Sequence, residues 1–254
     1  MPDGSGQRPA VITVYYEPET AIGLGQPHRD FAYQLACRGF VTLSLGTSEA
    51  TAEKTYSLYY PDISNATIQP PSMLAYAAAN AWHVLAQHAS VDSQRIGIVG
   101  HSFGGKWAMF ASCLFDRFAC AVWSDPGIIF DESRPNVNYW EPWYLGYHHQ
   151  PWRGRGVLTK ENPAHGLYPK LVAEGYDLHE LHALMAPRPF LVSGGSEYPP
   201  ERWLVLNHTV AINRLLGWEN RVMMSNRAEH DPTEESNEII YLFFEYFLGN
   251  RFNE

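Results

Sequence analysis

Hydrophobic and polar positions along most of this chain follow two alternating periods. Short apolar runs bounded by Gly, Pro or polar residues are typical of buried strands, whereas apolar residues every three to four positions indicate amphipathic helices. The runs predict strands at residues 10–16, 40–45, 95–99, 119–124, 190–193 and 221–225. The helical period predicts helices at residues 28–38, 71–89, 104–114, 201–216 and 234–248. Helices that separate strands in this way predict an α/β fold, with a mostly parallel twisted sheet covered on both faces.

One stretch, residues 126–187, interrupts this alternation. It carries several aromatic residues among Pro, Gly and His, namely Tyr139, Trp140, Trp143, Tyr144, Tyr147 and Trp152. A long irregular segment inside a compact domain is usually functional, so we expect a cap over an active site. Trp140, Trp143 and Trp152 are the expected substrate contacts. The alternative is that these rings only pack the insertion.

Composition places the chain among ordinary enzymes. A length of 254 residues with 45% hydrophobic content suits one catalytic domain over residues 1–254. A net charge of −9 argues against a nucleic-acid or anionic-membrane partner. No apolar run is long enough to cross a bilayer. The chain as given lacks a signal peptide, which predicts a cytoplasmic protein unless it is a trimmed form of a secreted or periplasmic bacterial one.

The sequence Gly100-His101-Ser102-Phe103-Gly104 carries the clearest chemical signal. It is a G-x-S-x-G motif between a predicted strand and a predicted helix, which is the setting of the nucleophile elbow in α/β hydrolases. Glycines are required two residues before and after the serine because side chains there would collide with neighbouring backbone. The turn holds the Ser102 hydroxyl clear of the sheet at the helix N-terminus. Ser102 is therefore the predicted nucleophile.

A serine nucleophile needs a base, and the base needs a carboxylate that orients it. His230 lies between the last predicted strand and the last predicted helix, where the α/β-hydrolase chain order places the base. Two acids are candidates. Glu197 follows the strand at 190–193 and is favoured on topology, while Asp125 follows the strand at 119–124 and is the alternative.

The remaining site predictions concern charge stabilisation. The backbone N–H of Phe103 and one from Tyr16 or Glu17, after the first strand, are expected to form the oxyanion hole. Lys106 stands in the first turn of a helix, where a cation opposes the dipole. It is expected either to be solvated or to reach toward the substrate. No metal site is expected, because the histidine pairs of the chain do not complete a coordination set, and no cofactor motif is present.

The chain resembles bacterial carbohydrate esterases of the glucuronoyl esterase and acetyl xylan esterase neighbourhood. Gly100-His-Ser-Phe-Gly-Gly-Lys106 parallels the glucuronoyl esterase elbow Gly-Cys-Ser-Arg-x-Gly-Lys, and the segment from Asp177 to Val192 parallels the one before the acid-bearing strand. The resemblance implies an α/β-hydrolase fold, Ser102 as nucleophile, His230 as base and Lys106 in contact with sugar hydroxyls. It leaves both acid positions open. The chain departs from the family at Phe103, where the family has an arginine implicated in oxyanion stabilisation.

These observations predict a serine esterase that acts on carbohydrate-linked or small acyl esters without a cofactor. The alternatives are a peptidase of the prolyl oligopeptidase type and a non-catalytic binding protein with a hydrolase fold. The strands that usually precede the first one of this fold are missing from the pattern. The sequence therefore predicts a shortened sheet or a homodimer that covers the exposed edge.

Overall fold

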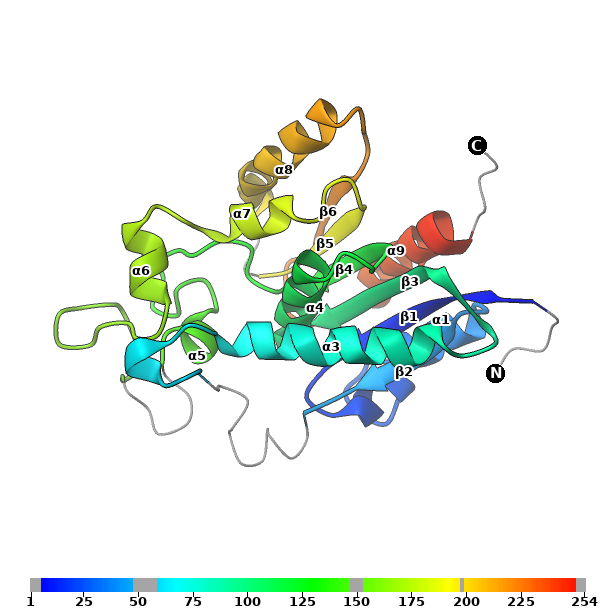
Figure 1. Ribbon diagram of the computed structural model, residues 1–254, viewed down its shortest axis with the longest axis horizontal. Helices are drawn as coiled ribbons and strands as arrows, with labels where there is room; N and C mark the ends of the chain where they lie inside the picture. Colours follow the sequence, from blue (N-terminus) through cyan, green and yellow to red (C-terminus); the bar gives the residue numbers. More distant parts are fainter. Residues whose placement is uncertain (1–5, 48–58, 147–152, 197–198, 250–254) are drawn as a thin grey trace.

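The computed structural model describes residues 6–47, 59–146, 153–196 and 199–249 (Figure 1). Within these ranges a six-stranded sheet has the order β2-β1-β3-β4-β5-β6, and every neighbouring pair is parallel. The strands are β1 (Arg8–Val14), β2 (Val41–Leu45), β3 (Val91–His101), β4 (Cys120–Ser124), β5 (Phe190–Gly194) and β6 (Val222–Asn226). The mostly parallel sheet predicted from the sequence is confirmed.

Helices cover both faces of this sheet, as predicted. The longer ones are α1 (Phe31–Cys37), α3 (Pro70–Ala86), α4 (Phe103–Leu114), α8 (Trp203–Leu215) and α9 (Glu234–Phe244). Alternate strand residues enter two separate cores, because side chains alternate across a sheet. Ile12 and Ile98 pack in the core that contains α3 and α4, while Val11 and Val99 pack in the core that contains α1 and α9.

Several boundaries differ from the predicted ones for local reasons. The first long helix was expected to begin at residue 28, but His28 has a φ of 61° and the helix begins at Phe31. Left-handed backbone cannot continue into a right-handed helix. Short 3-10 turns precede several elements: η1 (Pro18–Ile22), η2 (Ile63–Asn65) and η3 (Pro200–Arg202). After α9 the chain continues as a π turn, η4 (Glu245–Gly249).

The segment between β4 and β5 holds the predicted cap. Its described part contains three short helices, α5 (Glu141–Tyr144), α6 (Tyr168–Ala173) and α7 (Leu178–Ala183), joined by irregular backbone. A buried ion pair fastens it, since Arg153 donates a hydrogen bond of 2.6 Å to the carboxylate of Glu141. Figure 1 shows α5 and α6 beyond one end of the sheet, displaced from the strand layer.

The sheet ends at β2 on one side and at β6 on the other among the residues that the structure describes. Each edge strand has one neighbour, so its outer backbone groups face away from the sheet. In the same ranges, none of the helices has the length and apolar character that crossing a membrane requires.

Candidate active site

The elbow at Ser102 has the strained geometry that the motif predicts. Ser102 lies between β3 and α4 with φ 58° and ψ −115°, and its N–H donates to the Ser124 carbonyl at 2.8 Å. A Cβ at Gly100 would lie 2.2 Å from the Gly104 carbonyl oxygen, and one at Gly104 would lie 2.0 Å from the Val14 carbonyl oxygen. Only glycine fits at these two positions, so the hydroxyl of Ser102 is presented at the carboxyl end of the sheet.

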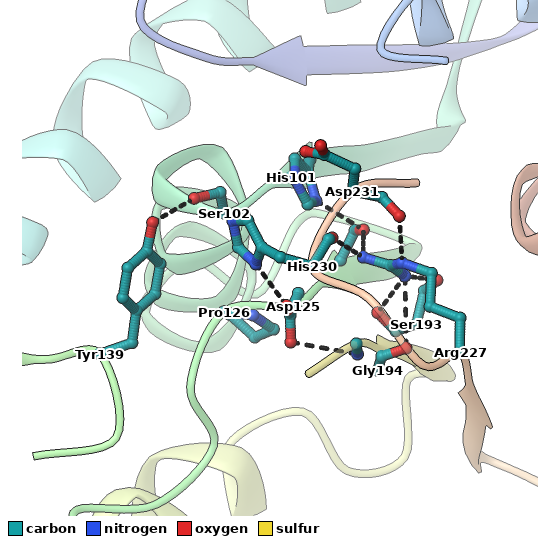
Figure 2. Close-up of polar contacts among 12 residues, drawn as sticks. His101, Ser102, Asp125, Pro126, Tyr139, Ser193, Gly194, Arg227, His230 and Asp231 are labelled. Atoms are coloured by element: carbon teal, nitrogen blue, oxygen red, sulfur yellow. Dashed lines mark hydrogen bonds and ion pairs between the residues drawn. The ribbon is translucent and has the colours of Figure 1, made fainter. Parts of the chain in front are cut away.

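His230 lies in the loop between β6 and α9, at the same edge of the sheet as Ser102. The side chain of Arg227 fixes this loop: it donates to the carbonyl of His230 at 2.6 Å, to that of Asp231 at 2.9 Å and to that of Ser193 at 3.0 Å (Figure 2). One guanidinium thus ties the histidine loop to the end of β5. The sequence analysis did not single out Arg227.

The carboxylate that meets His230 is that of Asp125, directly after β4. A hydrogen bond joins His230 Nδ1 to Asp125 Oδ2, and the carboxylate is fully buried. Its other oxygen accepts the Gly195 N–H at 3.1 Å. A Cβ at Gly195 would lie 2.5 Å from Oδ2, so the glycine makes room for the carboxylate. Glu197, the favoured acid of the sequence analysis, lies outside the described residues, and Asp125 was the alternative.

The Ser102 hydroxyl has a partner that the sequence did not predict. Ser102 Oγ is hydrogen-bonded to the phenol of Tyr139 at 2.9 Å (Figure 2). The Tyr139 ring also meets the His230 ring edge to face, with centroids 5.3 Å apart. Between the described atoms of Ser102 and His230 no hydrogen bond is formed. Such bonds are often long in unliganded enzymes and tighten with substrate.

Lys106 is buried, so of the two alternatives given by the sequence the solvated one is wrong. Its side chain is 1% exposed, and its ammonium donates to the Pro126 carbonyl. Nζ also lies 4.3 Å from the ring centroid of Tyr139 and 4.5 Å from that of Trp140. These are favourable cation–π distances. Direct contact between Lys106 and a substrate would require the rings to move, and it remains a prediction.

The three tryptophans predicted to bind substrate have different outcomes. Trp140 is fully buried, and its indole donates to the Gly127 carbonyl at 3.0 Å. Its ring packs against Phe110 and Phe130. Packing in the core therefore accounts for the position of Trp140, and direct contact with a ligand does not. Trp143 belongs to α5, but the structure does not describe its side chain. Trp152 lies outside the described residues.

A second histidine lies beneath the site. His101 precedes Ser102, and its ring packs at a tilt on that of His230 with centroids 4.7 Å apart. Its Nδ1 is hydrogen-bonded to Ser124 Oγ at 3.0 Å. Burial, together with the charges of His230, Arg29 and Arg227, holds the pKa of His101 well below its usual value. The neutral ring therefore supports His230 without adding a positive charge.

Comparison with known proteins decides the family. A model of the alpha/beta hydrolase family matches residues 11–246. The chain belongs to this family. No curated protein sequence matches it significantly.

Solved structures confirm the hydrolase fold. A glucuronoyl esterase from Solibacter usitatus superposes with a TM-score of 0.65 at 17% identity, over 95% of this chain and 74% of that one. A carbohydrate esterase family 15 glucuronoyl esterase from Caldicellulosiruptor kristjansonii gives 0.66 at 20% identity, over 97% and 72%. The glucuronoyl esterase catalytic domain from Hypocrea jecorina gives 0.62 at 16%, over 98% and 68%. These neighbours agree with the resemblance seen in the sequence.

The predicted oxyanion-hole residues of this hydrolase lie beside the elbow. Phe103 begins α4, and its buried ring stacks on that of Tyr16 with centroids 4.4 Å apart. The loop after β1 is therefore held against the Ser102 elbow, because Tyr16 follows that strand. Glu17 directly precedes η1 in the same loop, and its side chain makes no capping hydrogen bond there. Which two N–H groups bind the oxyanion remains a prediction.

Proposed function

We propose that this hydrolase is a serine esterase in which Ser102, His230 and Asp125 act as the catalytic triad. The observation that carries the proposal is the buried Asp125 carboxylate on His230 Nδ1, at the same sheet edge as the strained Ser102. A carboxylate there fixes the tautomer whose Nε2 accepts a proton, and it stabilises the imidazolium that forms.

The reaction follows from these three side chains. Ser102 Oγ attacks the ester carbonyl carbon while His230 Nε2 takes the hydroxyl proton. The electron pair of the C=O bond moves to oxygen, near the N-terminus of α4. The tetrahedral intermediate collapses as His230 returns the proton to the leaving alcohol. Water, activated by the same histidine, then attacks the acyl-enzyme and releases the acid.

The proposed substrates are carbohydrate-linked or small acyl esters. Support comes from the sequence resemblance and from the neighbours, whose printed names are glucuronoyl esterases and a methylesterase. Fold similarity at such low identity does not transfer a substrate, so the class must be assayed.

A panel of acetyl, butyryl, methyl-uronate and aryl esters, with a prolyl peptide amide as the peptidase arm, tests the proposal. Wild type should hydrolyse at least one ester, and Ser102→Ala should lower kcat about 10⁴-fold or more while the melting temperature stays the same. Hydrolysis of the peptide amide alone would favour the peptidase. Equal rates for the two proteins would mean that Ser102 is not the nucleophile, and inactivity of wild type would favour the binding protein.

A further inference from the structure

The contact between Tyr139 and the nucleophile is the feature that the triad leaves unexplained. The phenol oxygen lies 2.9 Å from Ser102 Oγ, and the half-buried ring borders His230. Figure 2 shows Tyr139 reaching Ser102 from its own segment, which is separate from the loop that carries His230. A polar group is therefore already in contact with the atom that would attack the substrate.

The backbone that presents Tyr139 is strained. Val137, Asn138 and Tyr139 have φ values of 49°, 52° and 75°, in the left-handed region that non-glycine residues rarely adopt. Flanking contacts hold the run in place: the Asn138 amide donates to the Ile129 carbonyl at 3.1 Å, and Val137 is fully buried. Strain of this kind persists only where the surroundings enforce it, and it clusters at functional sites.

The charge beneath the ring adds to the argument. The buried ammonium of Lys106 lies 4.3 Å from the centroid of Tyr139. A cation on the face of a phenol draws electron density from the ring, which makes the O–H a stronger hydrogen-bond donor. Because the Lys106 ammonium is buried, solvent screens its effect on the half-buried ring less than it would at the surface. The same positive charge also favours any negative charge that develops at the phenol.

The direction of the hydrogen bond follows from the chemistry. In the free enzyme either hydroxyl can donate, but once Ser102 has given its proton to His230 its oxygen can only accept, so the phenol is then the donor. As the Oγ–C bond forms, the negative charge moves to the carbonyl oxygen, which is attached to the carbon that Oγ attacks. A donor that contacts Oγ is thus one short displacement from the developing oxyanion.

We propose that Tyr139 is a further catalytic residue, whose phenol O–H rests on Ser102 in the free enzyme and donates to the oxyanion in the transition state. The inference rests on the proposed esterase function. No proton leaves Tyr139: the serine proton goes to His230, the C=O electron pair goes to oxygen, and the phenol contributes a hydrogen bond. Lys106 is a positioning residue that acts through the Tyr139 ring.

The test compares Tyr139→Phe with Tyr168→Phe. Tyr168 is a second cap tyrosine, and its hydroxyl donates to Glu132 at 2.7 Å instead of contacting the nucleophile. Removal of an oxyanion donor should lower kcat on an aryl acetate about 10²–10³-fold. KM should change by less than about threefold, because the bond forms in the transition state. Tyr168→Phe should keep the wild-type rate.

The inhibition constant of a transition-state analogue distinguishes a catalytic role of Tyr139 from a merely structural one. An aryl trifluoromethyl ketone forms a tetrahedral adduct with the serine, and the oxygen of this adduct is negatively charged. Its inhibition constant should rise in Tyr139→Phe by about the same factor as kcat/KM falls. An unchanged constant, or a rate within threefold of wild type, would overturn the inference. A faster Tyr139→Phe enzyme would instead make Tyr139 a lid that blocks Ser102.

The Lys106→Met substitution tests whether the Lys106 cation acts through the ring of Tyr139. If Lys106 acts through the phenol, the Lys106→Met substitution should lower kcat about tenfold in the wild-type background. In the Tyr139→Phe background it should lower kcat by less than about twofold. Equal losses in both backgrounds would overturn the role of the ring as intermediary. Failure of the proposed esterase function can be distinguished from failure of the Tyr139 inference. In the former case the wild-type protein itself would be inactive, and a fluorophosphonate would leave Ser102 unmodified.

Discussion

At the scale of single residues, the carboxylate that contacts His230 in the structure is the one predicted from the sequence as the alternative acid. That carboxylate belongs to Asp125, while Glu197, favoured from the sequence, lies outside the described residues and stays a prediction. Asp125 reaches the histidine because its own φ is 46°, which turns the chain sharply after β4. A residue-by-residue pattern does not reveal such a turn, because an aspartate before a proline is ordinary loop sequence.

Replacement of the acid tests this choice. Asp125→Asn should lower kcat about 10⁴-fold, because an amide stabilises the wrong imidazole tautomer and does not offset the imidazolium charge. Glu197→Gln is the matched control and should change kcat by less than about threefold. Steady-state kinetics on the best ester decide between them. The reverse ranking would restore Glu197 as the acid.

At the scale of elements, the loop after β6 depends on one side chain. Arg227 binds carbonyl groups from its own loop and from β5, so it replaces the regular hydrogen bonds that a loop lacks. The ring of His230 is positioned through this backbone. The sequence placed the histidine correctly because the order of strands and helices requires it, but the partners of an arginine are set by the fold.

Arg227→Lys should therefore loosen the histidine loop. Lysine keeps the charge but lacks the planar fork that bonds several carbonyls at once. We expect kcat to fall about 10- to 100-fold with little change in KM, because misplacement by about 1 Å can cost that much. Hydrogen exchange of the amides from 227 to 233 should accelerate in parallel. Arg214→Lys, an exposed change on α8, is the control, and equal rates in the two variants would contradict the role of Arg227.

At the scale of the whole molecule, most of the hydrolase fold could be predicted from the pattern of apolar positions. All six strands match because each is a compact apolar run whose period is local. The cap could not be predicted in detail, because left-handed residues such as Val137 and Tyr139 are imposed by surrounding contacts. The burial of Lys106 was missed for the same reason: its cover comes from a segment distant in sequence.

The stability of the whole molecule should depend on a buried histidine. His182 is fully buried against Trp123, and burial, with a smaller effect of His179 and His208, lowers its pKa to about 3. Above pH 6.5 the imidazole is neutral in both states. Between pH 6.5 and 3 only the unfolded chain binds the proton, so the free energy of unfolding falls as the pH falls, by up to about 1.4 kcal/mol for each unit.

His182→Leu should therefore flatten this acid dependence. Urea titrations at pH 7 and pH 4.5 should show a smaller loss of unfolding free energy than in wild type, because leucine binds no proton. His83→Leu, at an exposed histidine, should leave the loss unchanged. An identical loss in His182→Leu and wild type would mean that this histidine does not carry the effect.

The position of β6 at the end of the sheet has a consequence for when the protein can work. Ser102 and Asp125 follow β3 and β4 in the middle of the sheet, but His230 follows β6, which is an edge strand and the last of the six described strands in chain order. A nascent chain can therefore assemble the other five described strands and still lack the proposed base beside Ser102. Local opening of β6 would move His230 away from Ser102 while the centre of the sheet stays intact, so the proposed esterase activity would be lost before the molecule unfolds as a whole.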